Sequence, residues 1–150
     1  MLIANALAYL HLLGVIGVFA CLSMEIVLCR TEWLNSAALR KLAAIDLAYG
    51  ASAALVLATG LARIYGLGKD PEWYWANGLL HAKLGLFVGV ALLSLLPTLR
   101  FLRWRRQWLC QQRLPATAEI NTTRRLIMVE VHVLAVIPLL AVLLARGWGG

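Results

Sequence analysis

Charged side chains are scarce in this sequence. Only 14% of its 150 residues are Asp, Glu, Lys or Arg, and only seven of them are acidic, whereas 62% are hydrophobic. An average soluble domain has about 25% charged and about 45–50% apolar residues. So few charged groups exclude an ordinary soluble domain, because they do not suffice to cover its surface in water. We therefore expect the lipid bilayer to be the solvent of this chain.

Cysteine pairs, linkers and repeats are lacking as well. Cys21, Cys29 and Cys110 form no C-x-x-C motif, and we interpret them as unpaired thiols. No Ser/Gly-rich linker, low-complexity segment or internal repeat divides the chain, so we expect one domain over residues 1–150. No lysine or arginine precedes the first apolar run, which is too long for a signal-peptide core. We expect that run to be retained.

Long apolar runs are abundant. Four of them are long enough to cross a hydrocarbon core of about 30 Å as helices. They cover residues 2–28, 43–65, 75–99 and 126–144. The sequence therefore predicts an all-α integral membrane protein, a four-transmembrane-helix bundle.

Basic residues gather in two of the connections between these runs. Because loops rich in Lys and Arg stay in the cytoplasm, both termini are expected outside it, an N-out, C-out topology. The inner connections hold Arg30, Arg40, Lys41, Arg100, Arg103, Arg105, Arg106, Arg113, Arg124 and Arg125, whereas the outer side has Arg63, Lys69 and Arg146.

The net charge of +7 is densest in RFLRWRRQWLCQQR, residues 100–113. Arginine interleaved with tryptophan beside a membrane span favours contact with anionic lipid headgroups over nucleic acid. We expect a loop over residues 100–125, with Asn121 or Thr122 capping the last helix.

On the outer side, GLGKDPEWYWANG at residues 66–78 has turn signals and three aromatic residues, typical of a lid at the outer interface.

Seven ionisable side chains fall inside the predicted spans. They are His11, Glu25, Asp46, His81, Lys83, Glu130 and His132. A charge at the bilayer centre costs about 2.5–3.5 kcal/mol on insertion scales, so such groups usually face the bundle and have partners. A wholly structural explanation for seven of them is unattractive.

Depth divides these residues into two groups. At about 1.5 Å per residue, His81 lies about 9 Å, Lys83 about 12 Å and His11 about 13 Å from the outer ends of their spans, so these three form an outer group. His132 lies deeper, at about 21 Å. Glu25, Asp46 and Glu130 lie toward the cytoplasmic ends. We interpret these three as ion-pair partners of the inner basic residues or as a proton route to the outer group.

The outer group favours a haem. Imidazole ligands on facing helices with an apolar surround are what a four-helix bundle uses to hold haem, whereas copper or zinc would call for more thiolate or carboxylate at that depth. His81 and Lys83 are about 200° apart around a helix, so one flat ligand does not easily reach both. His11 paired with His81 and His11 paired with Lys83 both stay open, and His132 is a further candidate.

Three stretches resemble a known family, the HemJ-type protoporphyrinogen oxidases, which are small bacterial membrane proteins with b-type haem. LHAKLGLFVGVALL at residues 80–93 resembles the family's W-L-H-x-K-L segment. YLHLLGVIGVFA at residues 9–20 resembles its A-L-H-I-I helix, and RRLIMVEVHVLAVIPLL at residues 124–140 its R-x-x-N-E-V-P helix, with Glu130 at the acidic position. The chain looks equally like the broader CopD-like group of small membrane proteins.

The resemblance implies haem b, with His11 and Lys83 as the first candidates for axial ligation and His81 as the second. It further implies a redox role in a bacterial inner membrane, oxidation of protoporphyrinogen IX to protoporphyrin IX with electrons passed to quinone or a similar acceptor. Two other hypotheses stay open. One is a proton- or copper-linked transporter. The other is a non-catalytic membrane subunit that contacts a partner, or a second copy of itself, through the G-x-x-x-G of Gly85 and Gly89.

Overall fold

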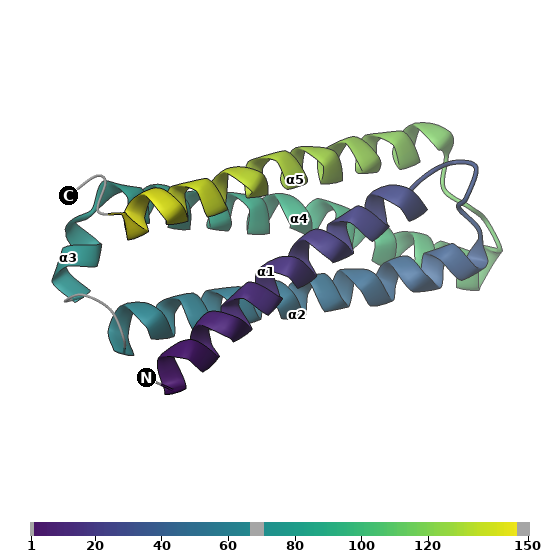
Figure 1. Cartoon of the computed structure of the whole chain (residues 1–150). Coiled ribbons are helices and arrows are strands. Elements are labelled where there is room, and N and C mark those ends of the chain that lie inside the picture. The colour runs from purple at the N-terminus through teal and green to yellow at the C-terminus, as the bar shows by residue number, and fades with distance from the viewer. Residues whose placement is uncertain (1, 67–70, 147–150) are drawn as a thin grey trace.

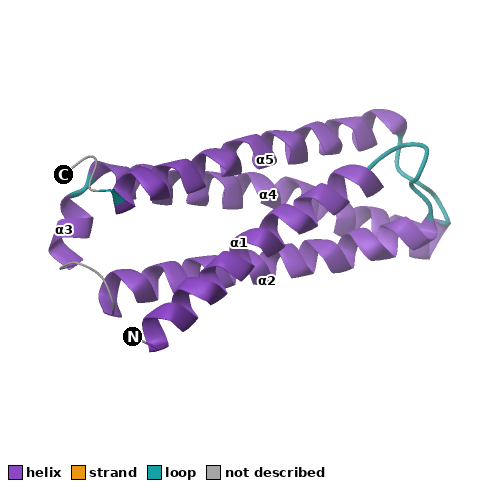
Figure 2. Cartoon of the chain, viewed as in Figure 1, coloured by secondary structure: helices purple, strands orange, loops and turns teal. Residues whose placement is uncertain are grey.

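The computed structural model describes residues 2–66 and 71–146. Five helices account for almost all of these residues, and no strand occurs within the two ranges (Figure 2). They are α1 (Leu2–Leu28), α2 (Ser36–Gly66), the short α3 (Pro71–Ala76), α4 (Gly78–Gln111) and α5 (Thr117–Ala145). The four long helices are each long and apolar enough to cross a membrane, which confirms the predicted fold class.

Side-chain and backbone caps define where the helices start and stop. The Asn35 side chain accepts a hydrogen bond of 2.9 Å from the Ala38 amide at the start of α2, and Asn77 accepts one of 2.9 Å from the Leu79 amide at the start of α4. Such caps satisfy amides that have no partner inside the helix. The C-terminal end of α4 is capped by Gln112, whose backbone is left-handed (φ 53°). The Gln112 amide donates a hydrogen bond to the Trp108 carbonyl.

The long helices form two antiparallel hairpins, α1 with α2 and α4 with α5 (Figure 1). The hairpins meet where α2 contacts α4 and where α1 contacts α5. The start of α1, the end of α5 and α3 lie at one end of the bundle, which we call the outer end in accordance with the predicted topology (Figure 1). The loops at residues 29–35 and 112–116 lie at the other, inner end.

Two glycines of α1 let it lie directly against α2. A Cβ atom on Gly14 would come within 2.8 Å of the Val56 side chain and 3.3 Å of the Ser52 carbonyl oxygen, and one on Gly17 within 2.6 Å of the Ser52 hydroxyl. Small residues permit such close approach of helices in a membrane. In contrast, space is open beside Gly50, Gly85 and Gly89, so these three glycines do not pack between helices of the bundle.

The buried core lies mainly toward the inner end. Its largest side chains come from all four long helices and include Leu22 of α1, Leu39 of α2, Trp104 of α4 and Ile127 of α5, which are almost completely buried. Toward the outer end the buried hydrophobic residues are few, and a small separate group forms around Ile64 and Leu80. The hairpins are therefore tightly packed at one end and leave space between them at the other.

The helices extend further than the predicted spans. α1 coincides with its span, but α2 begins at Ser36, α4 runs to Gln111 and α5 begins at Thr117. The expectation of a loop over residues 100–125, capped by Asn121 or Thr122, is wrong, because hydropathy marks only the lipid-embedded part of a helix. With 34 residues, α4 is about 51 Å long, well over the hydrocarbon thickness of about 30 Å.

The outer connection is partly helical, since α3 occupies residues that were expected to form a loop. Residues 67–70, with Lys69, lie outside the described residues, and so does part of the expected lid. The rest of the connection places the Trp75 ring beside His81.

Candidate functional site

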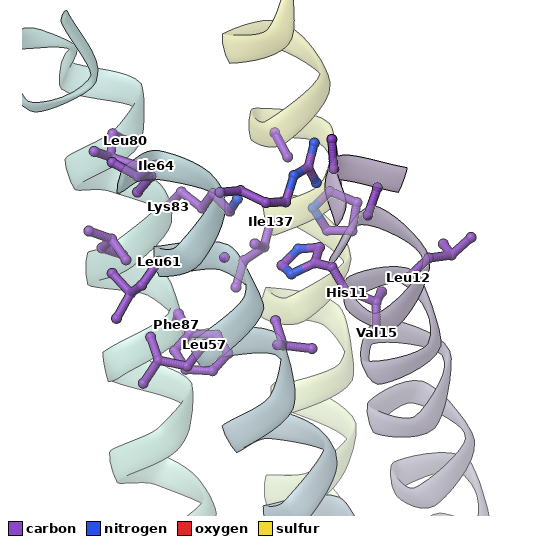
Figure 3. Close-up of a pocket in the computed structure, with 18 of the residues that line it drawn as sticks. His11, Leu12, Val15, Leu57, Leu61, Ile64, Leu80, Lys83, Phe87 and Ile137 are labelled. Atoms are coloured by element: carbon purple, nitrogen blue, oxygen red, sulfur yellow. The ribbon is translucent and has the colours of Figure 1, made fainter. Parts of the chain in front are cut away.

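A cavity of about 680 Å³ lies between the two hairpins at the outer end (Figure 3). All four long helices contribute to its wall, which is mostly apolar and includes Leu57, Leu61, Phe87 and Ile137. Cavities of about 300–1,000 Å³ with apolar walls and a few polar groups are typical binding sites for small molecules and cofactors. The polar side chains of this cavity therefore decide what it can bind.

His11 of α1 is held in one orientation by α2. Its Nδ1 lies 2.9 Å from the Thr59 hydroxyl oxygen, and that hydroxyl donates its only hydrogen to the Leu55 carbonyl at 2.6 Å. With its hydrogen directed to that carbonyl, Thr59 accepts a hydrogen bond, which favours the His11 tautomer that carries its proton on Nδ1. In that tautomer Nε2 keeps its lone pair, as in a histidine that ligates a metal through Nε2.

Gly60 makes room for this ring. A Cβ atom at Gly60 would lie 3.4 Å from the His11 Cε1 atom and 3.8 Å from Nδ1. The imidazole thus lies against the backbone of α2, one residue beyond its hydrogen-bond partner Thr59. The position of His11 is set by packing on one side and by a hydrogen bond on the other.

Two cationic side chains share the cavity with His11. Lys83 reaches it from α4 and Arg63 from the outer part of α2, and both interact electrostatically with His11. Figure 3 shows the His11 ring and the Lys83 side chain extending into the same space from opposite helices. Within residues 2–66 and 71–146 the one ion pair is Arg103 with Glu119, at 3.6 Å. Neither cation in the cavity has an acidic partner there, so the cavity favours an anionic ligand.

The other two candidate histidines lie elsewhere. His81 is exposed, with its Nδ1 3.2 Å from the Asn77 carbonyl oxygen and its ring centroid 6.0 Å from that of Trp75. His132 is exposed on α5, with its Nδ1 2.6 Å from the Met128 carbonyl oxygen. Neither lines the outer cavity. Of the outer group, the structure thus brings together His11 and Lys83 but not His81.

The three carboxylic acids meet in the inner half of the bundle. Glu25 interacts electrostatically with both Asp46 and Glu130, and Glu130 interacts with Asp46. We call Glu25, Asp46 and Glu130 the acid cluster. None of them forms an ion pair with a described basic residue. Asp46 accepts a hydrogen bond of 2.8 Å from Thr98.

Sequence reasoning missed Arg63 and Thr59 as parts of the outer site. Arg63 was counted only as a charge on the outer side, and a threonine in an apolar helix gave no signal by itself. A signal does exist in their spacing, because Thr59, Gly60 and Arg63 lie within about one helical turn of one another. One turn of α2 thus carries the partner of His11, the space for its ring and a charge for a ligand.

Comparison with known proteins places the chain in a family but attaches no activity to it. No curated protein and no solved structure matches the sequence. Residues 3–149 match the family described as "Predicted membrane protein (DUF2214)". Together with the four candidate spans, this match shows a multi-pass membrane protein, and the chain belongs to the DUF2214 family of predicted membrane proteins.

Proposed function

We propose that this protein binds a b-type haem in the outer cavity and has a redox role in the membrane. The observation that carries the proposal is His11, which lines the cavity while its Nδ1 is hydrogen-bonded to Thr59. Haem in a helical bundle is commonly held by such a histidine, with its other ring nitrogen bonded to the protein. The proposal also accounts for two cations in an otherwise apolar cavity.

The donor set suits haem better than a bare metal ion. Among the described residues no three His, Cys, Asp or Glu side chains are placed to hold a metal ion, and the cavity supplies one imidazole and one amine. Zinc and copper sites usually have three or four protein ligands, whereas haem iron needs only axial ones from the protein. The apolar wall suits the porphyrin face.

Four polar side chains at the outer site have roles in this proposal. His11 ligates the iron, and Thr59 fixes the imidazole tautomer and orientation. Arg63 pairs with a propionate carboxylate near the outer surface. Lys83 pairs with the second propionate or, as the neutral amine, supplies the second axial ligand. The bound haem supplies one-electron transfer between ferric and ferrous iron.

The substrate in this proposal follows from the resemblance to HemJ-type oxidases. Protoporphyrinogen IX loses six electrons and six protons to become protoporphyrin IX, and a quinone or similar acceptor takes up the electrons. The membrane in this proposal is a bacterial inner membrane.

The test of haem binding is a titration of purified protein, in mild detergent, with haem. We expect saturable binding with a Soret band, which His11→Ala abolishes and Lys83→Ala weakens or shifts. His132→Ala is the matched control, because that histidine lies outside the cavity, and it should bind as the unmodified chain does. Equal binding by His11→Ala and the unmodified chain would overturn the proposal.

The oxidase specialisation needs its own experiment. We expect the chain to restore growth of a bacterial strain that lacks protoporphyrinogen oxidase, and His11→Ala to fail to do so. Failure of the unmodified chain, when present in the membrane and haem-loaded, would refute this substrate and leave the haem site standing.

A further inference from the structure

A second site lies in the inner half of the bundle, at the acid cluster. Glu25 of α1 and Glu130 of α5 are each only 1% exposed, and Asp46 of α2 is half-buried. Three acids from three helices thus converge inside a protein that has only seven acidic residues in total. The outer cavity includes none of them.

The two buried glutamates have unsatisfied oxygen atoms. Oε1 of Glu25 and Oε1 of Glu130 have no hydrogen-bond partner among the described residues. A buried polar atom without a partner costs about 1–3 kcal/mol, and more when it is charged. Two such atoms, in side chains that interact electrostatically, indicate that a group other than the described protein residues satisfies them.

Neutral hydroxyl groups complete the surroundings of the cluster. Thr98 of α4 donates to Asp46 at 2.8 Å. The Tyr49 hydroxyl of α2 hydrogen-bonds the Ser94 side chain of α4 and interacts electrostatically with all three acids. Hydroxyl groups bond to a carboxylate or a carboxylic acid but bring no positive charge, so these three side chains do not neutralise the cluster.

Two basic groups of the inner end interact electrostatically with Cys29, and the buried Nε of one of them, Arg124, has no hydrogen-bond partner among the described residues. Arg100 of α4 donates to the Thr123 hydroxyl at 2.9 Å, and Arg124 of α5 interacts with Cys29, the buried thiol that follows Glu25 by one turn of α1. Neither arginine forms an ion pair with a member of the cluster. Within the described residues the acid cluster therefore has no ion-pair partner.

We propose that the acid cluster is a proton-binding site, in which Glu25 and Glu130 share protons that exchange with the inner aqueous phase by way of Asp46. A proton on one carboxyl group gives it an O–H that donates to the unsatisfied oxygen of its neighbour, so one proton removes a charge and satisfies two atoms. A metal ion fits less well, because no three acidic, His or Cys side chains of the described residues are placed to hold one. Asp46 is the least enclosed member, since it is half-buried and the glutamates are buried.

The inference does not rest on the haem proposal. Glu25 follows His11 by 14 positions, about 21 Å along α1, and the buried side chains of Val18 and Leu22 lie on the same helix between them. The two sites are therefore separate, and each can fail without the other.

Infrared difference spectroscopy of the purified protein tests the inference. At neutral pH we expect the C=O stretching band of a protonated carboxyl group, which Glu25→Gln or Glu130→Gln diminishes and the double variant removes. The band should shift when the protein is transferred to D₂O, because the carboxyl proton exchanges for deuterium. This exchange should be slower in Asp46→Asn, because protons reach the glutamates by way of Asp46. Glu119→Gln is the matched control and should leave the band unchanged. A band absent from the unmodified protein, or still present in the double variant, would overturn the proposal.

Stability gives a second readout that does not depend on the spectrum. Glutamine resembles a protonated glutamate in shape and charge, so Glu25→Gln and Glu130→Gln should unfold at the same detergent or denaturant concentration as the unmodified chain. If the carboxylates are ionised around a metal ion, the same variants should be destabilised, and added chelator should destabilise the unmodified chain as well. That pair of results would show that the acid cluster binds a metal ion and not a proton.

Discussion

Thr59→Val tests the structural basis of the outer site most sharply. Valine keeps the shape of threonine but removes the oxygen that accepts the His11 Nδ1 hydrogen bond at 2.9 Å. Thr59 is only 4% exposed, so water does not readily replace that acceptor, and the unsatisfied N–H costs about 1–3 kcal/mol. Loss of such an orienting partner typically lowers metal affinity about 10–100-fold. We expect haem affinity to fall within that range.

The assay is a haem titration of each variant, followed by the Soret absorbance in mild detergent. Thr59→Ser keeps a hydroxyl and should recover most of the affinity. Thr122→Val is the matched control, because the Thr122 hydroxyl donates to the Ala118 carbonyl at 2.8 Å, in the same i−4 pattern, on an exposed face of α5. If Thr59→Val binds haem as tightly as the unmodified chain while His11→Ala does not bind, Thr59 has no part in fixing the ligand.

Three further predictions concern packing, topology and capping. Gly14→Ala should destabilise the bundle by about 1–3 kcal/mol, because its added methyl group would overpack the contact with α2. Gly85→Ala should be neutral or stabilising, because space is open beside Gly85. Unfolding curves measured in detergent compare the two variants. Burial raises the pKa of Cys29 to about 12, so below that pH Cys29 stays a protonated, unreactive thiol, and a maleimide should label Cys110 instead. A membrane-impermeant maleimide should label Cys110 only after the cell is opened. Labelling of Cys110 in intact cells would reverse the topology. Asn77→Ala removes the cap of α4 and should cost about 0.5–2 kcal/mol in the same unfolding assay, and an unchanged curve would show that the cap adds nothing.

The number and type of the long helices were predictable because lipid requires uninterrupted apolar runs. Their ends were not, since Ser36, Gln111 and Thr117 lie in segments that are polar but still helical. Hydropathy reports where a helix meets lipid and not where its hydrogen bonding stops. The cap of α4 at Asn77 and its left-handed end at Gln112 depend on backbone geometry that hydropathy does not report.

The candidate site was partly predictable for the same physical reason. The cost of burying polar groups in hydrocarbon singled out His11 and Lys83, and the structure places both at one cavity. Helical spacing already indicated that His81 and Lys83 face different ways. Arg63 and Thr59 could not be found from composition, because their role depends on how α1 crosses α2.

The central claim is that the outer cavity holds a haem through His11. The most direct measurement is the optical spectrum of the protein purified from its own membrane in mild detergent, before and after reduction with dithionite. The account predicts a Soret band that shifts on reduction and is lost in His11→Ala. A colourless protein that takes up no added haem would contradict it.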